Sequence, residues 1–137
     1  MRNRYYTPEE ANAVLGEVKE KVLSMRSALR ELRGLAAVLR DPREESDDPM
    51  RRKGKKRMLS LQKTINGLFD DMTQMGIEIK DLEHGLVDFP ALKAGQEVLL
   101  CWRLGEESVR YWHTLADGYR GRRSLDDIPD EVWLWSN

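Results

Sequence analysis

The sequence has a single cysteine, few aromatic residues and no long apolar run. Cys101 alone cannot form an internal disulfide framework or a metal site made only of cysteines from one chain. A stretch such as Val98–Trp102 is far too short to cross a bilayer. The first ten residues hold no apolar signal core. We therefore expect a cytoplasmic protein that does not enter the membrane.

The sequence also has no large excess of positive or negative charge. The 23 basic and 24 acidic residues give a net charge of −1, which argues against nucleic-acid binding through overall charge. No Gly-rich phosphate loop, Ser-His-Asp order or zinc-type cysteine and histidine spacing is present. With 137 residues, 40% of them hydrophobic, the chain fits a single domain over residues 1–137.

The N-terminal part carries the pattern of a long helix over residues 8–39. Thr7 is a good cap, Pro8 suits the first turn, and Glu10 completes a capping box. Apolar residues then follow at alternating spacings of four and three, the heptad seam of a coiled coil. We expect mid-seam Leu29 to be fully buried. The seam consists of Ala11, Leu15, Val18, Val22, Met25, Leu29, Leu32, Ala36 and Leu39.

A second heptad series follows a polar loop at residues 40–48. Asp48 and Pro49 mark the new helix start, and Gly76 suits its end. Two such seams predict an antiparallel helical hairpin over residues 7–75 and a homodimer through it, because two helices leave apolar surface uncovered. The second seam consists of Met58, Leu61, Ile65, Leu68, Met72 and Met75.

The basic run at residues 51–57 allows two interpretations. Cations at the tip of a helical arm suit phosphates, so RNA contact is one hypothesis. The other is a solvated helix start neutralised by the acidic residues just before it. No aromatic residues for base stacking are interleaved, so nucleic-acid binding remains the weaker interpretation.

From Gly76 onward the pattern is that of a small antiparallel sheet over residues 76–137. Strands are expected at 77–81, 86–89 (ended by Pro90), 97–104 and 109–115. Pairing Leu104 with Val109 across a four-residue loop puts Trp102, Tyr111 and His113 on the core face. The same register puts Cys101, Arg103, Arg110 and Trp112 on the opposite face.

Several C-terminal phrases resemble a known family. They are Gly85–Ala91, Val98–Glu106, Tyr111–His113 and Gly118–Arg122, together with Thr7–Asn12 near the N-terminus. These are similar to an uncharacterised bacterial family, the domain of unknown function 2203. The resemblance implies a bacterial source and an α+β layout with a long helical N-terminal part. It supplies no activity.

Two kinds of site remain open on the C-terminal sheet. Asp81, His84 and Asp88 near the first turn form a nitrogen and oxygen metal-ligand set. Cys101 and His113 would suit thiol–imidazole chemistry, but the expected register separates them, whereas a three-residue loop would bring them together. The candidate ligand or anion site consists of Cys101, Arg103, Glu106, Arg110, Trp112, His113 and Arg122.

The sequence therefore predicts an α+β protein, a long antiparallel helical hairpin followed by a small antiparallel sheet. We expect a self-associating binding module. The rival hypothesis is a small enzyme or a metal- or anion-binding protein, and its cofactor is unknown. That rival places its site around Asp81, His84, Asp88, Cys101, Arg103, Glu106 and His113.

Overall fold

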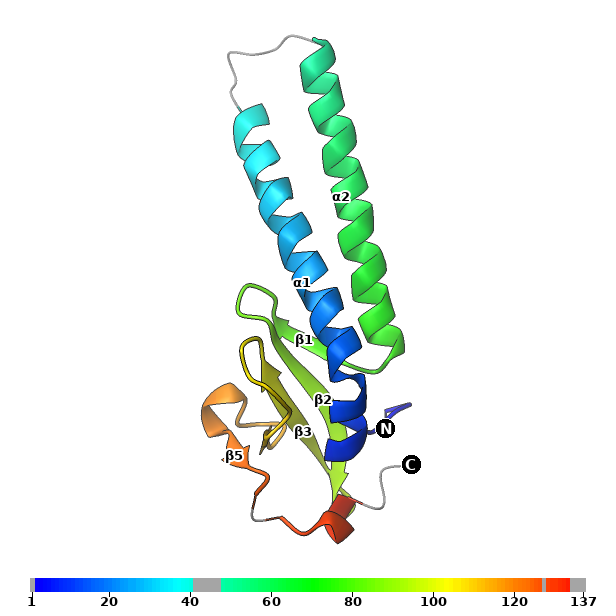
Figure 1. Ribbon diagram of the computed structural model, residues 1–137, viewed down its shortest axis with the longest axis vertical. Helices are drawn as coiled ribbons and strands as arrows, with labels where there is room; N and C mark the ends of the chain where they lie inside the picture. The colour runs from blue at the N-terminus through cyan, green and yellow to red at the C-terminus, as the bar shows by residue number, and fades with distance from the viewer. Residues whose placement is uncertain (1, 41–47, 127, 134–137) are drawn as a thin grey trace.

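Two long helices form an antiparallel hairpin whose base packs on a five-stranded antiparallel sheet (Figure 1). The computed structural model describes residues 2–40, 48–126 and 128–133. The helices are α1 (Pro8–Leu39) and α2 (Pro49–Gln74). The strands are β1 (Glu78–Asp81), β2 (Leu86–Lys93), β3 (Gln96–Arg103), β4 (Tyr111–His113) and β5 (Arg123–Ser124), and the 3-10 turns are η1 (Tyr119–Gly121) and η2 (Asp130–Trp133). The predicted α+β class is confirmed.

Both helices begin at the residues that the sequence indicates. The Thr7 hydroxyl accepts a hydrogen bond from the Glu10 backbone N–H at 3.1 Å, and the Glu10 carboxylate accepts from the Thr7 N–H at 3.0 Å. At α2, Asp48 caps through a 2.7 Å bond from the Arg51 N–H. These local bonds satisfy backbone donors that a helix start leaves unpaired. Most of the loop expected at 40–48 lies outside the described residues.

The hairpin is well packed at its base and thinly packed toward its tip. The seam residues Val18, Val22 and Met25 of α1 are completely buried. Leu29, one turn further on, is only half-buried. The expectation that it is fully buried is wrong, because the sheet covers only the base of the hairpin and leaves the distal seam to two helices (Figure 1).

The sheet is a meander in the order β1-β2-β3-β4-β5. The register between β3 and β4 differs from the expected one, since Cys101 pairs with Tyr111 and Leu99 with His113. Val109 does not pair with Leu104 because the Asn12 side chain on α1 holds it, accepting from the Val109 N–H at 2.7 Å. The strand expected at 109–115 is accordingly reduced to three residues.

Pro90 does not end its strand, contrary to the sequence expectation. β2 continues to Lys93, with Pro90 paired to Leu99. The Pro90 carbonyl accepts a 2.7 Å bond from the Tyr6 N–H, so this edge of the residue points away from β3. In a strand, the N–H and the C=O of one residue point to the same side. The N–H that proline lacks would therefore also point away from β3. The ladder to β3 therefore loses no donor.

One face of the sheet packs against α1 and forms the core. Val87, Phe89, Leu100 and Trp102 are fully buried there beside the apolar side of the helix. Trp112, expected on the opposite face, belongs to this core with 7% of its surface exposed. None of the described helices is long and apolar enough to cross a membrane.

Candidate functional site

The face of the sheet opposite the helices carries the chemistry. Asp88 on β2 pairs directly with Cys101 on β3, and Cys101 pairs with Tyr111 on β4. Directly paired residues share a face of a sheet, and so do residues two apart along a strand. His113 therefore lies on the same face as Cys101, not opposite to it. The one-residue difference in register reverses the expected placement.

Asp88, Cys101 and His113 form a compact buried cluster. Their exposed fractions are 1%, 0% and 2%. The possible ligand atoms of the three residues, a carboxylate oxygen, the thiol sulfur and an imidazole nitrogen, all lie within 4.8 Å of one another. Three separate strands thus bring together the side-chain types that bind zinc-class metals.

The hydrogen bonds of His113 fix the state of its ring. Nδ1 lies 2.8 Å from the carbonyl oxygen of Thr114, which can only accept, so Nδ1 carries a proton. Nε2 lies 3.1 Å from Oδ2 of Asp88. In a neutral ring with the proton on Nδ1, Nε2 is an acceptor. It faces a second acceptor when the Asp88 carboxylate is ionised. Among the described residues, the other Asp88 oxygen, Oδ1, is buried with no nitrogen or oxygen donor in hydrogen-bond reach, while the Cys101 thiol interacts with the same carboxylate.

Burial dominates the electrostatics of the cluster. It raises the pKa of Asp88, an effect that the neighbouring His113 partly offsets. Burial, reinforced by the Asp88 carboxylate, raises the pKa of the Cys101 thiol to about 12. Without a cation in the cluster, Cys101 is thus a protonated thiol near neutral pH.

This geometry does not suit a thiol nucleophile. Such a site needs the imidazole between the thiol and the carboxylate, so that the ring can take the thiol proton. Here both nitrogens of His113 face oxygen atoms, one of Thr114 and one of Asp88. The arrangement instead resembles a metal ligand set, in which a ligating histidine donates its second N–H to a carbonyl or carboxylate.

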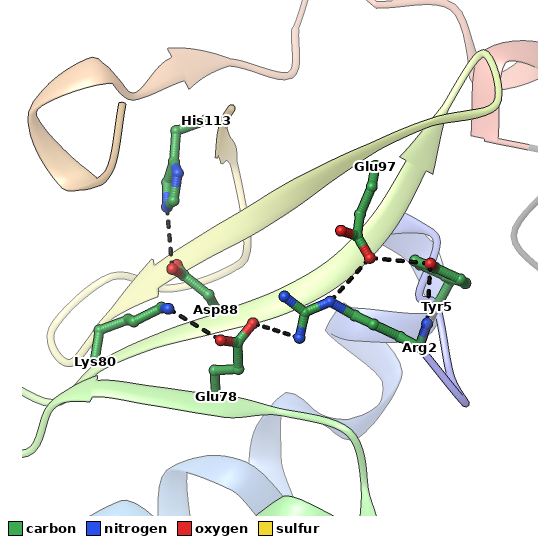
Figure 2. A network of polar contacts seen from close by, with 7 residues as sticks. All are labelled: Arg2, Tyr5, Glu78, Lys80, Asp88, Glu97 and His113. Carbon is green, nitrogen blue, oxygen red and sulfur yellow. Dashed lines mark hydrogen bonds and ion pairs between the residues drawn. The ribbon is translucent and has the colours of Figure 1, made fainter. Parts of the chain in front are cut away.

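A chain of ion pairs runs alongside the cluster (Figure 2). Arg2 contacts Glu78 at 2.8 Å and Glu97 at 2.9 Å, and the Tyr5 hydroxyl donates to the same Glu97 oxygen. Lys80 contacts Glu78 at 3.0 Å and contributes a positive field at Asp88. These contacts hold the N-terminal segment to the sheet.

The candidate anion residues separate into several places. Arg122 donates to Glu106 at 2.7 Å and to the Cys101 carbonyl at 3.2 Å, and its guanidinium stacks on Tyr111 at 4.0 Å. Arg122 is thus a neutralised structural cation beside the cluster. Arg103 lies further along β3 and contacts the Tyr119 hydroxyl at 3.4 Å.

Two further members of that set do not reach the cluster. Arg110 is exposed and contacts Ser108 at 2.9 Å. Trp112 lies on the other face of the sheet, the one that packs against the helices. Of the expected anion site, only Cys101 and His113 lie together in the buried cluster.

The expected metal set around the first turn is divided as well. Asp81 and His84 form an exposed pair, with Nδ1 of His84 2.6 Å from Asp81 Oδ2. This contact lowers the pKa of Asp81. Among the described residues, Asp88 groups with Cys101 and His113 instead of with this pair. The sequence signal that could have indicated a buried Asp88 is its position between two apolar residues, Val87 and Phe89.

The basic run begins α2 at the tip of the hairpin. Arg57 forms an ion pair with Glu31 of α1 at 2.6 Å, and Arg51 donates to the Leu39 carbonyl at 2.7 Å. These two cations therefore help to join the helices.

Comparison with known proteins supplies a family. The sequence model of the family described as uncharacterized conserved protein DUF2203 matches residues 4–125. The chain belongs to this family. No curated protein and no solved structure matches the chain. The DUF2203 match contains all three residues of the buried cluster, but the family description names no activity.

Proposed function

We propose that this DUF2203 chain is a metal-binding protein that holds one zinc-class divalent cation between Asp88, Cys101 and His113. The contact between Asp88 Oδ2 and His113 Nε2 carries the proposal, because with Asp88 ionised it sets two acceptors 3.1 Å apart in a fully buried place. Such a contact needs a proton or a cation between the atoms. A cation would also give the buried Oδ1 a charge partner nearby.

The ligand types and their spacing fit zinc. In a tetrahedral zinc site, bonds of about 2.0–2.3 Å place ligand atoms roughly 3.3–3.8 Å apart. The three ligand atoms here lie within 4.8 Å of one another, so small side-chain movements would close the site. A divalent ion with one thiolate, one carboxylate and one neutral imidazole has no net charge, which suits burial. The fourth tetrahedral position is left for water or another ligand.

Metal content of the purified chain, measured by mass spectrometry of the elements, tests the proposal. We expect about one zinc-class ion per chain after incubation with zinc and removal of loosely bound metal. Cys101→Ala and His113→Ala should lose it. His84→Ala is the matched control, since it removes the exposed histidine of the Asp81 pair and should keep the ion. Equal metal content in the His84 and His113 variants would overturn the proposal.

Self-association through the hairpin is a second candidate, with its own support. In the described distal part of the hairpin, residues 29–40 and 48–60, no side chain is fully buried. Val38, Met50 and Leu59 there are exposed by 70%, 83% and 71%. A second copy of this chain is the occupant that we propose, forming a four-helix arrangement.

The charge distribution suits this pairing. Residues 51–57 near the tip are basic, whereas exposed Glu9, Glu20 and Asp70 lie near the base of the hairpin. A two-fold dimer with antiparallel arms would place each basic tip beside the partner's acidic base. Sedimentation equilibrium at tens of micromolar should give twice the 15.9 kDa chain mass. We expect Leu59→Glu to give the monomer mass and Leu115→Glu, in the turn after β4, to leave the dimer intact. A monomer mass for the unaltered chain would contradict dimerisation.

A further inference from the structure

A second polar site lies at the end of the sheet, on the side of Trp112. A cavity of about 440 Å³ opens there between the β2–β3 turn and the segment after β4. Its lining includes Lys93 of β2, Trp112 of β4 and Arg123 of β5. The cavity therefore gathers side chains from three strands, and none of these three residues is a member of the Asp88, Cys101 and His113 cluster.

Two cations converge on one indole at this cavity. The Lys93 ammonium lies 5.0 Å from the centroid of the Trp112 ring, and the Arg123 guanidinium carbon lies 5.3 Å from it. Cation–π attraction holds each charged group near the ring. Across residues 2–40, 48–126 and 128–133, no carboxylate forms an ion pair with Lys93 or Arg123. Two like charges near one ring repel each other, and a bound anion would relieve that repulsion.

The remaining lining suits an organic anion. Glu97, the acidic residue of the described lining, already accepts from Arg2 and Tyr5 at 2.9 Å each. The Thr114 hydroxyl oxygen accepts from the Asp117 N–H at 3.2 Å, which leaves its O–H available to donate. Leu115, 52% exposed, adds an apolar wall to the cavity.

We infer that this cavity binds a small phosphate monoester, with Lys93 and Arg123 as the cations that attract the phosphate and with its organic part against Leu115. Two cations without a carboxylate partner in the described part of the chain favour a dianion over a monoanion, and this selects phosphate over a single carboxylate. The site is independent of the proposed metal site, because neither cation belongs to that cluster.

Titration calorimetry at constant ionic strength, with phenyl phosphate as the probe, tests this inference. We expect saturable binding that weakens about tenfold in Lys93→Gln and in Arg123→Gln. Arg110→Gln is the matched control, since it removes an exposed cation away from the cavity and should bind like the unaltered chain. Benzoate, a monoanion of similar shape, should bind more weakly than phenyl phosphate.

The indole N–H resonance of Trp112 provides a second readout in the unaltered protein. It should shift during titration with phenyl phosphate, and Trp112→Phe assigns the resonance. Absence of saturable binding, equal weakening by Arg110→Gln, or benzoate binding as tightly as phenyl phosphate would each overturn the inference. So would an unchanged Trp112 resonance at saturating probe.

Discussion

Zinc binding at Asp88, Cys101 and His113 is expected to raise the melting temperature of the metal-free chain. A ligand at 100 times its dissociation constant stabilises the folded state by about 2.7 kcal/mol. For 137 residues, an unfolding entropy of about 2.1 cal/mol/K per residue gives about 0.29 kcal/mol per degree. The expected shift is therefore about 9 °C under these conditions.

The assay is thermal unfolding by circular dichroism, with and without added zinc, for each variant separately. The difference within one variant cancels any intrinsic loss of stability that its substitution causes. Cys101→Ala and Asp88→Asn should lose most of the zinc-dependent shift, and His84→Ala should retain it. A full zinc-dependent shift in Cys101→Ala would refute the assigned ligand set.

Three further predictions follow from the packing. Met25→Ala removes a completely buried side chain and should cost about 2–5 kcal/mol in urea unfolding; half-buried Leu29 should cost less when replaced by alanine, and equal losses would contradict the packing gradient. Metal-free Cys101, 0% exposed, should not react with a small thiol reagent until the protein unfolds. Rapid labelling of the native protein would instead show an accessible thiol. Burial raises the pKa of Tyr6 above its ordinary value of 10.0, so the folded state keeps a proton that the unfolded state loses, and stability falls as pH rises above about 10. Tyr6→Phe should flatten that alkaline loss in urea unfolding, and an unaltered slope would argue against the buried hydroxyl as its source.

The helices were predictable because their signals are local. Thr7 and Glu10 lie one helical turn apart, and the heptad spacing can be recognised within the helix sequence itself, without reference to the sheet. The gradient of burial along the hairpin was not visible in that seam, because it depends on where the sheet ends. Leu29 has the same spacing as Val22 and Met25 but lies beyond the cover that buries them.

The strand pairing of the sheet could not be predicted from local patterns, because it depends on contacts between residues far apart in the sequence. The expected pairing of Leu104 with Val109 was wrong because Asn12, almost a hundred residues away, binds the Val109 backbone. Pro90 likewise remains in its strand because its carbonyl meets the Tyr6 N–H. Both decisive contacts join the sheet to the N-terminal segment or to α1, and neither has a local sequence signature.

The same register decides the site. Its three residues come from three strands, so a slip of one residue between β3 and β4 moves His113 away from Cys101. The sequence placed all three residues within the broad rival site on the C-terminal sheet, but the predicted metal set grouped Asp88 with its near neighbour His84. Asp88 in fact lies next to His113, 25 residues away in sequence.

The absorption spectrum of the cobalt-substituted chain tests the metal site most directly. Cobalt(II) occupies zinc sites, and a thiolate ligand gives it an intense near-ultraviolet charge-transfer band. The unaltered chain and His84→Ala should show this band at one cobalt per chain, together with the visible bands of tetrahedral coordination. Cys101→Ala should lack the charge-transfer band. If the unaltered chain showed no such band, or if the band persisted in Cys101→Ala, the buried cluster would not be the metal site.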